Sequence, residues 1–502
     1  MAKYLSFLCR IAALSGTIAF TQISLQADIK LPSVFGNHMV LQQGQKLPIW
    51  GWAAPGESVT VSVAGQSKST KADNNGSWEI HLSPISSSKT PVPFSVKGAN
   101  NSIEYKDVLV GEVWLCSGQS NMEWTVSRSL NPKEEIANGK HPLIRHIKIP
   151  HRPSDKPEKD VTPVGGGWQV CTPKTVANFS AVGYYFARYL KSNLDVPIGL
   201  LGSNWGGTRI EPWTPPSGFK SVPALKDTAA NLKDYPKKGN NGKIQHQSAL
   251  ALYNGMISPL KPYGIRGALW YQGESNNGEG MLYYEKKKAL INGWRDVWKN
   301  KKLPFYFVQL APFKYGNRNP LDLAGIWQAQ LSTLDIPYTG MAVTTDIGNT
   351  RDIHPKNKQE VGRRLALWAL NKDYGKKEIK YSGPLFKSAK FPSLIKKGTA
   401  IVRFSHSKGL KSSNNKPLTH WEIAGEDGKF SAAQATIKGN SVVIKNDTVK
   451  KPKFVRFGYN QEAEPNLVNG EGLPASPFTT CLLYTSDAAD EGLGVDLGGR
   501  RI

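Results

Sequence analysis

A serine follows a buried apolar run at a position where its hydroxyl could act as a nucleophile. Residues 108–115 are rich in β-branched and aromatic side chains and have the length of a buried strand. Gly118 permits the sharp turn that must follow, and Gln119 and Ser120 come next. In open α/β sheets, ligands bind at the carboxyl ends of the strands, so Ser120 is a candidate nucleophile by position. The structural alternative is a turn serine that caps the next helix.

A serine nucleophile needs a base to take its proton and an acid to orient that base. The chain has nine histidines, and only His354 lies beside a carboxylate, Asp352, in a loop that leaves a predicted strand. The sequence therefore predicts His354 as the base and Asp352 as the acid. Asp346, six residues before Asp352, is the alternative acid.

Acyl transfer also needs N–H donors aimed at the developing oxyanion. The backbone N–H of Ser120, a backbone N–H in Gly206-Gly207 and the side-chain amide of Asn276 are the candidates. Glycines suit this role because they let the backbone approach the substrate closely. We expect Gly207 to be the contributor from the glycine pair.

Three further polar residues in these loops are candidates for binding substrate: Gln119, Arg209 and Glu274. Arg209 and Glu274 have a second interpretation, an ion pair that holds the loops together, and we favour this structural role slightly.

The pattern around these residues alternates between strands and helices. Strand-length apolar runs occupy residues 108–115, 198–203, 265–271, 304–310 and 339–345, and helical periodicity occupies residues 175–194, 281–298, 321–334 and 359–370. Five such alternations predict a mostly parallel sheet between helices. Polar clusters follow the first, second, third and fifth strands. We therefore expect four loops to converge on one edge of the sheet and to form the site there.

The flanking regions read differently. Residues 28–106 and 377–479 contain short alternating runs separated by Gly, Asn and Pro, which predict two β-domains on either side of a catalytic domain at 107–376. Residues 480–502 do not continue this strand pattern, and we interpret them as a non-native tail.

Residues 1–27 read as a signal peptide, with Lys3 before a largely apolar stretch and Ala27 before Asp28. No later stretch reaches about 18 apolar residues. The sequence thus predicts a secreted or periplasmic protein with no membrane anchor after cleavage. Of the cysteines in the predicted domains, we expect Cys116 and Cys171 to be small buried hydrophobes, although a single disulfide is possible.

Several other chemistries are disfavoured. The formal charge of +25 comes from scattered lysines without a nucleic-acid-binding motif, so we expect no nucleic-acid partner. The Gly-x-Ser-x-Gly elbow of α/β-hydrolases is absent at Ser120, because Met122 occupies its last position. The chain has no His-Glu-x-x-His, no Cys-x-x-Cys and no phosphate-binding Gly-rich loop. The predicted chemistry requires no metal and no cofactor.

Four motifs together resemble the SGNH-hydrolase superfamily and, within it, the sialate O-acetylesterase family of carbohydrate esterases. They are Val113-Trp-Leu-Cys-Ser-Gly-Gln-Ser-Asn-Met-Glu-Trp124, Asn204-Trp-Gly-Gly-Thr-Arg-Ile-Glu-Pro-Trp213, Gly267-Ala-Leu-Trp-Tyr-Gln-Gly-Glu-Ser-Asn276 and Asp352-Ile-His-Pro355. The resemblance implies a flavodoxin-like three-layer α/β/α core with N-terminal and C-terminal β-sandwich-like domains.

The resemblance also implies roles for individual residues. Ser120 matches the nucleophile, the Gly206-Gly207 turn and Asn276 match the oxyanion contributors, and His354 with Asp352 matches the base and acid. One feature departs from the superfamily, whose last block usually reads Asp-x-x-His, whereas one residue separates the pair here.

The implied activity is removal of O-acetyl groups from sugars, with sialic acid as the first substrate class to consider. Acetylxylan or another acetylated polysaccharide is the alternative substrate, and a carbohydrate-binding protein without activity is the alternative outside enzymes. The sequence makes no prediction about the oligomeric state.

Overall fold

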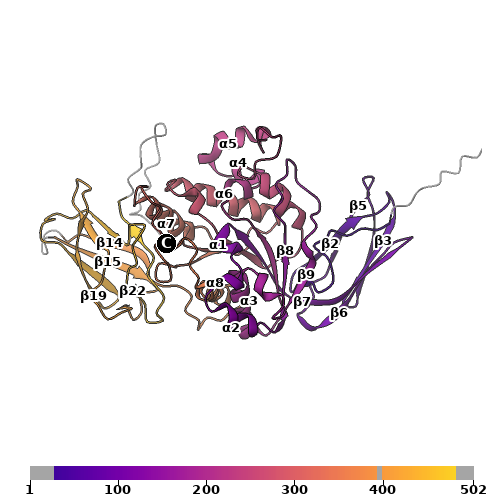
Figure 1. The fold of residues 1–502 in the computed structure, drawn as a ribbon, viewed down its shortest axis with the longest axis horizontal. Coiled ribbons are helices and arrows are strands. Elements are labelled where there is room, and N and C mark those ends of the chain that lie inside the picture. Colours follow the sequence, from indigo (N-terminus) through magenta and orange to yellow (C-terminus); the bar gives the residue numbers. More distant parts are fainter. Residues whose placement is uncertain (1–27, 393–397, 482–502) are drawn as a thin grey trace, which may run out of the picture.

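The computed structural model describes residues 28–392 and 398–481. Figure 1 shows three parts in a row: N-terminal strands, a central α/β part and C-terminal strands. The predicted signal peptide, residues 1–27, lies outside the described residues, as does the predicted tail beyond Cys481. Within the described residues, no helix combines the length and the apolarity needed to cross a bilayer.

The central sheet has the strand order β13-β12-β11-β7-β10-β8-β9. Its strands are β7 (Ser102–Gly118), β8 (His141–Lys148), β9 (Val164–Cys171), β10 (Ile198–Asn204), β11 (Gly267–Tyr271), β12 (Phe305–Val308) and β13 (Thr339–Ala342). All neighbours from β13 to β8 pair in parallel, and β9 pairs antiparallel with β8. The predicted α/β class is confirmed, and the sheet as a whole is mixed because β9 and the N-terminal strands join it.

Helices cover both faces of this sheet (Figure 1). They are α3 (Ala181–Leu194), α6 (Leu282–Val297), α7 (Asp322–Ser332) and α8 (Lys358–Lys372). The ring of Trp114 on β7 contacts Phe186 of α3, whereas Trp270 on β11 contacts Trp294 of α6. Trp270 of β11 pairs with Ser117 of β7, so their side chains lie on the same face of the sheet. Side chains alternate between faces along a strand, and Ser117 lies an odd number of residues from Trp114, so Trp114 and Trp270 point to opposite faces. Helices α3 and α6 therefore lie in different layers.

The helix predicted for residues 175–194 is divided at Ser180. A 3-10 turn, η2 (Val176–Asn178), precedes α3, and the Ser180 hydroxyl accepts the Gly183 N–H and caps the new helix. The sulfur of Cys116 lies against Gly183, and both Cys116 and Cys171 are buried free thiols. The expectation that these two cysteines are small buried hydrophobes is confirmed.

Short helices connect the strands. The α-helical ones are α1 (Ser120–Glu123), α2 (Pro132–Ala137), α4 (Pro216–Lys220) and α5 (Lys226–Ala230). The others are η1 (Val126–Arg128), η3 (Glu211–Trp213), η4 (Pro223–Leu225), η5 (Leu232–Asp234), η6 (Tyr253–Ile257), η7 (Ser258–Leu260), η8 (Glu274–Asn276) and η9 (Thr333–Asp335).

The N-terminal part is antiparallel except for β1, which pairs in parallel with β7, and it shares β7 with the central sheet. Its strands are β1 (Val40–Gln42), β2 (Leu47–Trp52), β3 (Ser58–Val63), β4 (Gln66–Lys71), β5 (Ser77–Leu82) and β6 (Ser88–Lys97). The first half of β7 pairs with β6, and its last residues pair with β10 and β11. The predicted domain boundary between residues 106 and 107 thus falls inside β7, and one apolar core runs through both parts.

The C-terminal part has its own apolar core between two antiparallel sheets, β14-β15-β20-β19 and β18-β17-β21-β23. Its strands are β14 (Leu385–Lys390), β15 (Thr399–Ser405), β16 (Lys411–Ser412), β17 (Trp421–Ala424), β18 (Ser431–Ala432), β19 (Gln434–Lys438), β20 (Ser441–Lys445), β21 (Phe454–Phe457), β22 (Leu467–Val468) and β23 (Phe478–Thr479). The rings of Phe404, Trp421 and Phe478 contact one another in that core.

Candidate active site

The turn after β7 holds Ser120 at the edge of the sheet. Gly118 ends the strand with φ +132°, and a Cβ at this position would lie 2.2 Å from the Tyr271 carbonyl oxygen. Only glycine fits there, because a side chain would be strained and would also clash with the backbone of β11. The Gln119 N–H donates to the same Tyr271 carbonyl at 2.9 Å, and Ser120 then begins α1.

Ser120 and His354 form a hydrogen-bonded pair although 234 residues separate them in the chain. The Ser120 Oγ lies 2.8 Å from the His354 Nε2, and the ring of Trp124 stacks on the imidazole with centroids 4.5 Å apart. Burial lowers the pKa of His354, and the nearby charges of Lys358 and Arg128 lower it further, while Asp352 acts in the opposite direction. The imidazole is thus neutral at neutral pH and can accept the serine proton.

The two candidate acids occupy different positions. Asp352 Oδ1 accepts the backbone N–H of His354 at 2.9 Å and lies 4.0 Å from the ring Nδ1. Asp346 lies on Arg364, and each of its oxygens accepts a guanidinium N–H at 2.6 Å. Asp352 is therefore the carboxylate next to the imidazole, and it supports the backbone of His354 more directly than the ring.

The Gly206-Gly207 turn lies next to the serine. A Cβ on Gly206 would come 3.2 Å from the Ser120 Cβ, and the Gly206 N–H donates to Glu123 Oε2 at 2.8 Å. Gly207 has φ +73° and open space at its Cβ position. Within residues 28–392 and 398–481, the N–H groups of Ser120 and Gly207 have no hydrogen-bond acceptor. These two donors remain free to bind an oxyanion.

Asn276 has no free donor to offer. Its Nδ2 donates to Glu211 Oε2 and to Glu279 Oε2, both at 3.1 Å, and its Oδ1 accepts from the Ile210 N–H and from Gln272 Nε2. The side chain is fully buried. Its amide ties the loops after β10 and β11 together, so we leave Asn276 out of the oxyanion site proposed below.

The remaining predicted residues also hold loops in place. Arg209 contacts Glu211 at 2.9 Å, contacts Glu279 and donates to the Ser275 carbonyl. Gln119 Oε1 accepts the backbone N–H groups of Gly273 and Ser275, both at 3.3 Å.

Glu274 is buried and does not pair with Arg209. Its Oε1 accepts from Asn121 Nδ2 at 2.6 Å, and its Oε2 has no hydrogen-bond partner among the residues that the structure describes.

Glu123 is a site residue that the sequence reading did not identify. Its Oε1 accepts from Lys148 Nζ at 2.9 Å and lies 2.6 Å from His151 Nε2, while its Oε2 holds the Gly206 N–H. Burial alone would raise the pKa of Glu123, but hydrogen bonds from His151 and Lys148 lower it to about 2. The carboxylate is thus ionised at neutral pH and fixes the glycine turn beside Ser120.

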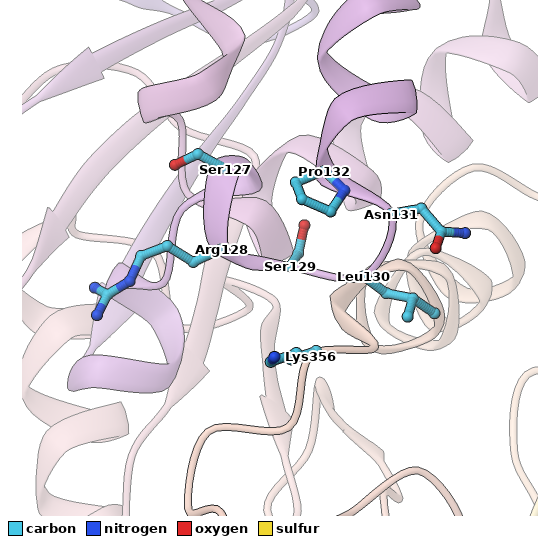
Figure 2. A pocket seen from close by; sticks show the side chains of 7 residues that line it. All are labelled: Ser127, Arg128, Ser129, Leu130, Asn131, Pro132 and Lys356. Carbon is cyan, nitrogen blue, oxygen red and sulfur yellow. The ribbon is translucent and has the colours of Figure 1, made fainter.

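Two cavities lie near the site, and His354 lines one of them. One of about 310 Å³ is lined by Ile347, Gly348, Asn349, Asp352, His354, Pro355, Lys356 and Asn357. The other, of about 360 Å³, is shown in Figure 2 and is lined by Ser127, Arg128, Ser129, Leu130, Asn131, Pro132 and Lys356. Lys356 lines both, so the second cavity adjoins the first. Neither Arg128 nor Lys356 has an ion pair with a carboxylate of the described residues.

The Arg128 guanidinium lies over Trp124, 4.1 Å from its ring centroid. Because Trp124 also stacks on His354, the cationic cavity is one aromatic ring away from the base. Among the residues that the structure describes, no group of three or more His, Cys, Asp or Glu side chains could hold a metal ion.

Comparisons with known proteins identify a family that matches the central part of the chain. Residues 110–371 match the family described as carbohydrate esterase, sialic acid-specific acetylesterase. The mouse sialate O-acetylesterase is 31% identical, with 80% of this chain and 83% of that protein covered. The human sialate O-acetylesterase is 32% identical, with 80% and 81% covered.

A solved structure is also similar over nearly the whole chain. The crystal structure of a carbohydrate acetylesterase from Xanthomonas citri is 37% identical, with a TM-score of 0.81, and the match covers 91% of this chain and 100% of that one. The similarity therefore extends beyond the central sheet to both flanking β parts.

Proposed function

Because the chain belongs to the sialic acid-specific acetylesterase family of carbohydrate esterases, we propose that it removes O-acetyl groups from sugars through a serine acyl-enzyme. The observation that carries this mechanism is the 2.8 Å contact between Ser120 Oγ and His354 Nε2. Membership of the family makes the protein a hydrolase of the carbohydrate-esterase class. The proposal adds the catalytic residues and the substrate.

In the first half of the reaction, Ser120 Oγ attacks the acetyl carbonyl carbon while His354 Nε2 takes the hydroxyl proton. The carbonyl oxygen becomes an oxyanion, and the free N–H groups of Ser120 and Gly207 are placed to receive it. The tetrahedral intermediate then expels the sugar oxygen, which takes the proton back from His354. Acetyl-Ser120 and the deacetylated sugar result.

In the second half, water attacks acetyl-Ser120 while His354 removes its proton. Collapse of the second tetrahedral intermediate releases acetate and returns the proton to Ser120. Asp352 holds the backbone of His354 and places a negative charge 4.0 Å from the ring, which favours the imidazolium that forms in each half.

For the substrate, we propose an O-acetylated acidic sugar of the sialic acid class. The mouse and human relatives are named sialate O-acetylesterases. The cavity of Figure 2, which shares Lys356 with the cavity that His354 lines, has two cations, Arg128 and Lys356, and no carboxylate among its lining residues. Cations without an internal partner favour a ligand that brings its own carboxylate. Acetylxylan, which is built from neutral sugars, remains the alternative.

The mechanism is tested by Ser120→Ala. We expect hydrolysis of p-nitrophenyl acetate to fall by roughly 10³-fold or more, because removing a nucleophile leaves only the binding and oxyanion contributions. Wild-type rates in this variant would exclude the mechanism. A protein that binds glycans saturably and releases no acetate would instead be a carbohydrate-binding protein.

The substrate is tested by measuring acetate released from O-acetylated sialosides and from acetylxylan by the same preparation. We expect a higher kcat/KM on the sialosides. A clear preference for acetylxylan would overturn the acidic-sugar assignment and leave the serine mechanism standing.

We also propose a finer fold and location. The parallel strands between two helical layers, with Ser120 directly after β7, support a flavodoxin-like core of the SGNH type. The charged and apolar pattern of residues 1–27 supports export to the periplasm or the medium. Mass spectrometry of the exported protein should find a mature N-terminus near Asp28.

A further inference from the structure

A buried polar network joins three loops directly behind the Ser120–His354 pair. Lys358 Nζ donates to Asn121 Oδ1 at 2.5 Å, and Asn121 Nδ2 donates to Glu274 Oε1 at 2.6 Å. Asn121 follows Ser120 in α1, Glu274 begins η8 after β11, and Lys358 begins α8. The exposed fractions are 0% for Lys358, 1% for Asn121 and 8% for Glu274. The network is thus closed to water.

This network is poorly satisfied for a purely structural element. The ammonium and the carboxylate do not touch, because the neutral amide of Asn121 lies between them. Within the described part of the chain, Lys358 Nζ has one hydrogen bond and lies 5.2 Å from the centroid of the Tyr271 ring, and the buried Glu274 Oε2 has no partner. Unpaired buried charges are costly, and groups of this kind concentrate at functional sites.

The network also reaches the base. Asn121 Nδ2 donates to the Ile353 carbonyl at 3.0 Å, and Ile353 directly precedes His354. The other constraints on His354 are the Asp352 carboxylate on its backbone N–H and the Trp124 ring on its face. With Asp352 4.0 Å from Nδ1, the peptide unit between Ile353 and His354, which is bonded at its carbonyl and at its N–H, is held more firmly than the ring itself.

We propose that Asn121, held between Lys358 and Glu274, is a positioning residue that sets His354 against Ser120. This inference rests on the proposed esterase mechanism. It assigns to Asn121 and Lys358 a share of the orienting task that a serine triad leaves to its carboxylate.

The charged groups that face His354 fix the sign of the expected effect. Lys358 and Arg128 lower the pKa of His354, Asp352 raises it, and burial lowers it. Burial also lowers the pKa of Lys358 itself, to about 7, although Glu274 and Asp352 oppose that shift. Lys358 therefore changes charge close to neutral pH, and removing its cation should move the His354 titration to higher pH.

Two substitutions at Lys358 separate its two roles. Lys358→Gln keeps an N–H donor for Asn121 and removes the charge, so we expect most of kcat to survive while the acidic limb of the kcat/KM profile moves to higher pH. Lys358→Met removes both, so we expect the same shift and a fall in kcat of about tenfold or more, with KM little changed. Lys372→Met, at an exposed lysine on the same helix, is the matched control and should behave like the wild type.

Asn121→Asp tests the donor to Ile353 separately, because it keeps the shape and loses both N–H groups. We expect a fall in kcat of about tenfold or more at unchanged KM, with thermal unfolding showing a folded protein. An independent readout is the NMR titration of the His354 ring in the wild type and in Lys358→Gln, which does not depend on turnover.

The outcomes distinguish this inference from the proposed function. A wild-type protein that releases no acetate would contradict the proposed function. The positioning role alone would be overturned by a different result. In that result the wild type is active, and Lys358→Gln and Asn121→Asp match it in kcat, in the acidic limb of kcat/KM and in the His354 titration. If Asn121→Asp fails to fold, the kcat of Lys358→Met, which removes the donor to Asn121, still decides the positioning role.

Discussion

The Asp352 carboxylate accepts the backbone N–H of His354 at 2.9 Å and stays 4.0 Å from the Nδ1 of the same residue. In a serine triad of the usual kind, the acid bonds to the ring and fixes its tautomer. Here one residue separates acid and base, and the short connection directs the carboxylate to the main chain. In the proposed mechanism, Asp352 therefore acts through the backbone geometry of the loop and through the electrostatic field of its carboxylate.

This relationship predicts a limited effect of Asp352→Asn. An asparagine oxygen can still accept the His354 N–H, so the loop should keep its shape, and the loss in kcat should be smaller than that of Ser120→Ala. Because the Asp352 charge raises the pKa of His354, its removal should move the acidic limb of kcat/KM to lower pH. The pH profiles of the two proteins measure this shift, whose direction is opposite to that expected for Lys358→Gln. An unchanged limb would show that the carboxylate charge does not reach the ring.

Glu123 should contribute to stability in a pH-dependent manner. Its folded-state pKa of about 2 lies below the ordinary value of 4.5, so the ionised form stabilises the fold above about pH 4.5. That contribution is lost as the pH falls from 4.5 toward 2. Urea unfolding should therefore show Glu123→Gln to be less stable than the wild type at pH 7, with a smaller difference at pH 3. Glu134→Gln, at an exposed carboxylate of α2, is the control and should show no such trend.

Gly118 should tolerate no side chain. Gly118→Ala places a Cβ 2.2 Å from the Tyr271 carbonyl oxygen at φ +132°, and backbone strain of this kind costs roughly 1–3 kcal/mol before any clash is counted. We expect a loss of unfolding free energy above that range together with loss of activity, because the turn places Ser120. Gly36→Ala is the control, since a Cβ there meets nothing within 4 Å. Equal unfolding free energies for the two variants would contradict the steric argument.

Local patterns were sufficient to predict the α/β class and the Ser120–His354 pair. Apolar runs such as residues 108–115 and 265–271 mark buried parallel strands, and polar residues directly after them must meet at one edge. The strand β8 was not predicted, because its buried residues include Arg145 and His146, which interrupt the apolar pattern. Arg145 is buried because Asp107 accepts its guanidinium N–H groups, a partner that the sequence does not reveal.

The contacts that complete the site could not be read from the sequence. Lys358 begins an amphipathic helix, where a lysine ordinarily faces solvent, and its partner Asn121 lies 237 residues away. For Asn276, the motif position suggested an oxyanion donor, whereas in the structure Glu211 and Glu279 accept both of its side-chain N–H groups. Such pairings depend on how loops pack, and a single sequence carries no signal for them.

Arg128 offers a test of substrate charge. Arg128 lines the cavity of Figure 2 and has no ion-pair partner among the described residues, so a sugar carboxylate is the partner that we propose for its guanidinium. Arg128→Met should raise KM for an O-acetylated sialic acid by roughly tenfold, since a charge-assisted hydrogen bond contributes about 1.5 kcal/mol or more. Hydrolysis of neutral p-nitrophenyl acetate has no carboxylate to lose, so its KM should change little. The wild-type KM for the acidic sugar should also rise with salt, and this rise should weaken in Arg128→Met. An equal loss on both substrates would indicate that Arg128 acts on Trp124 and His354 instead of on the sugar.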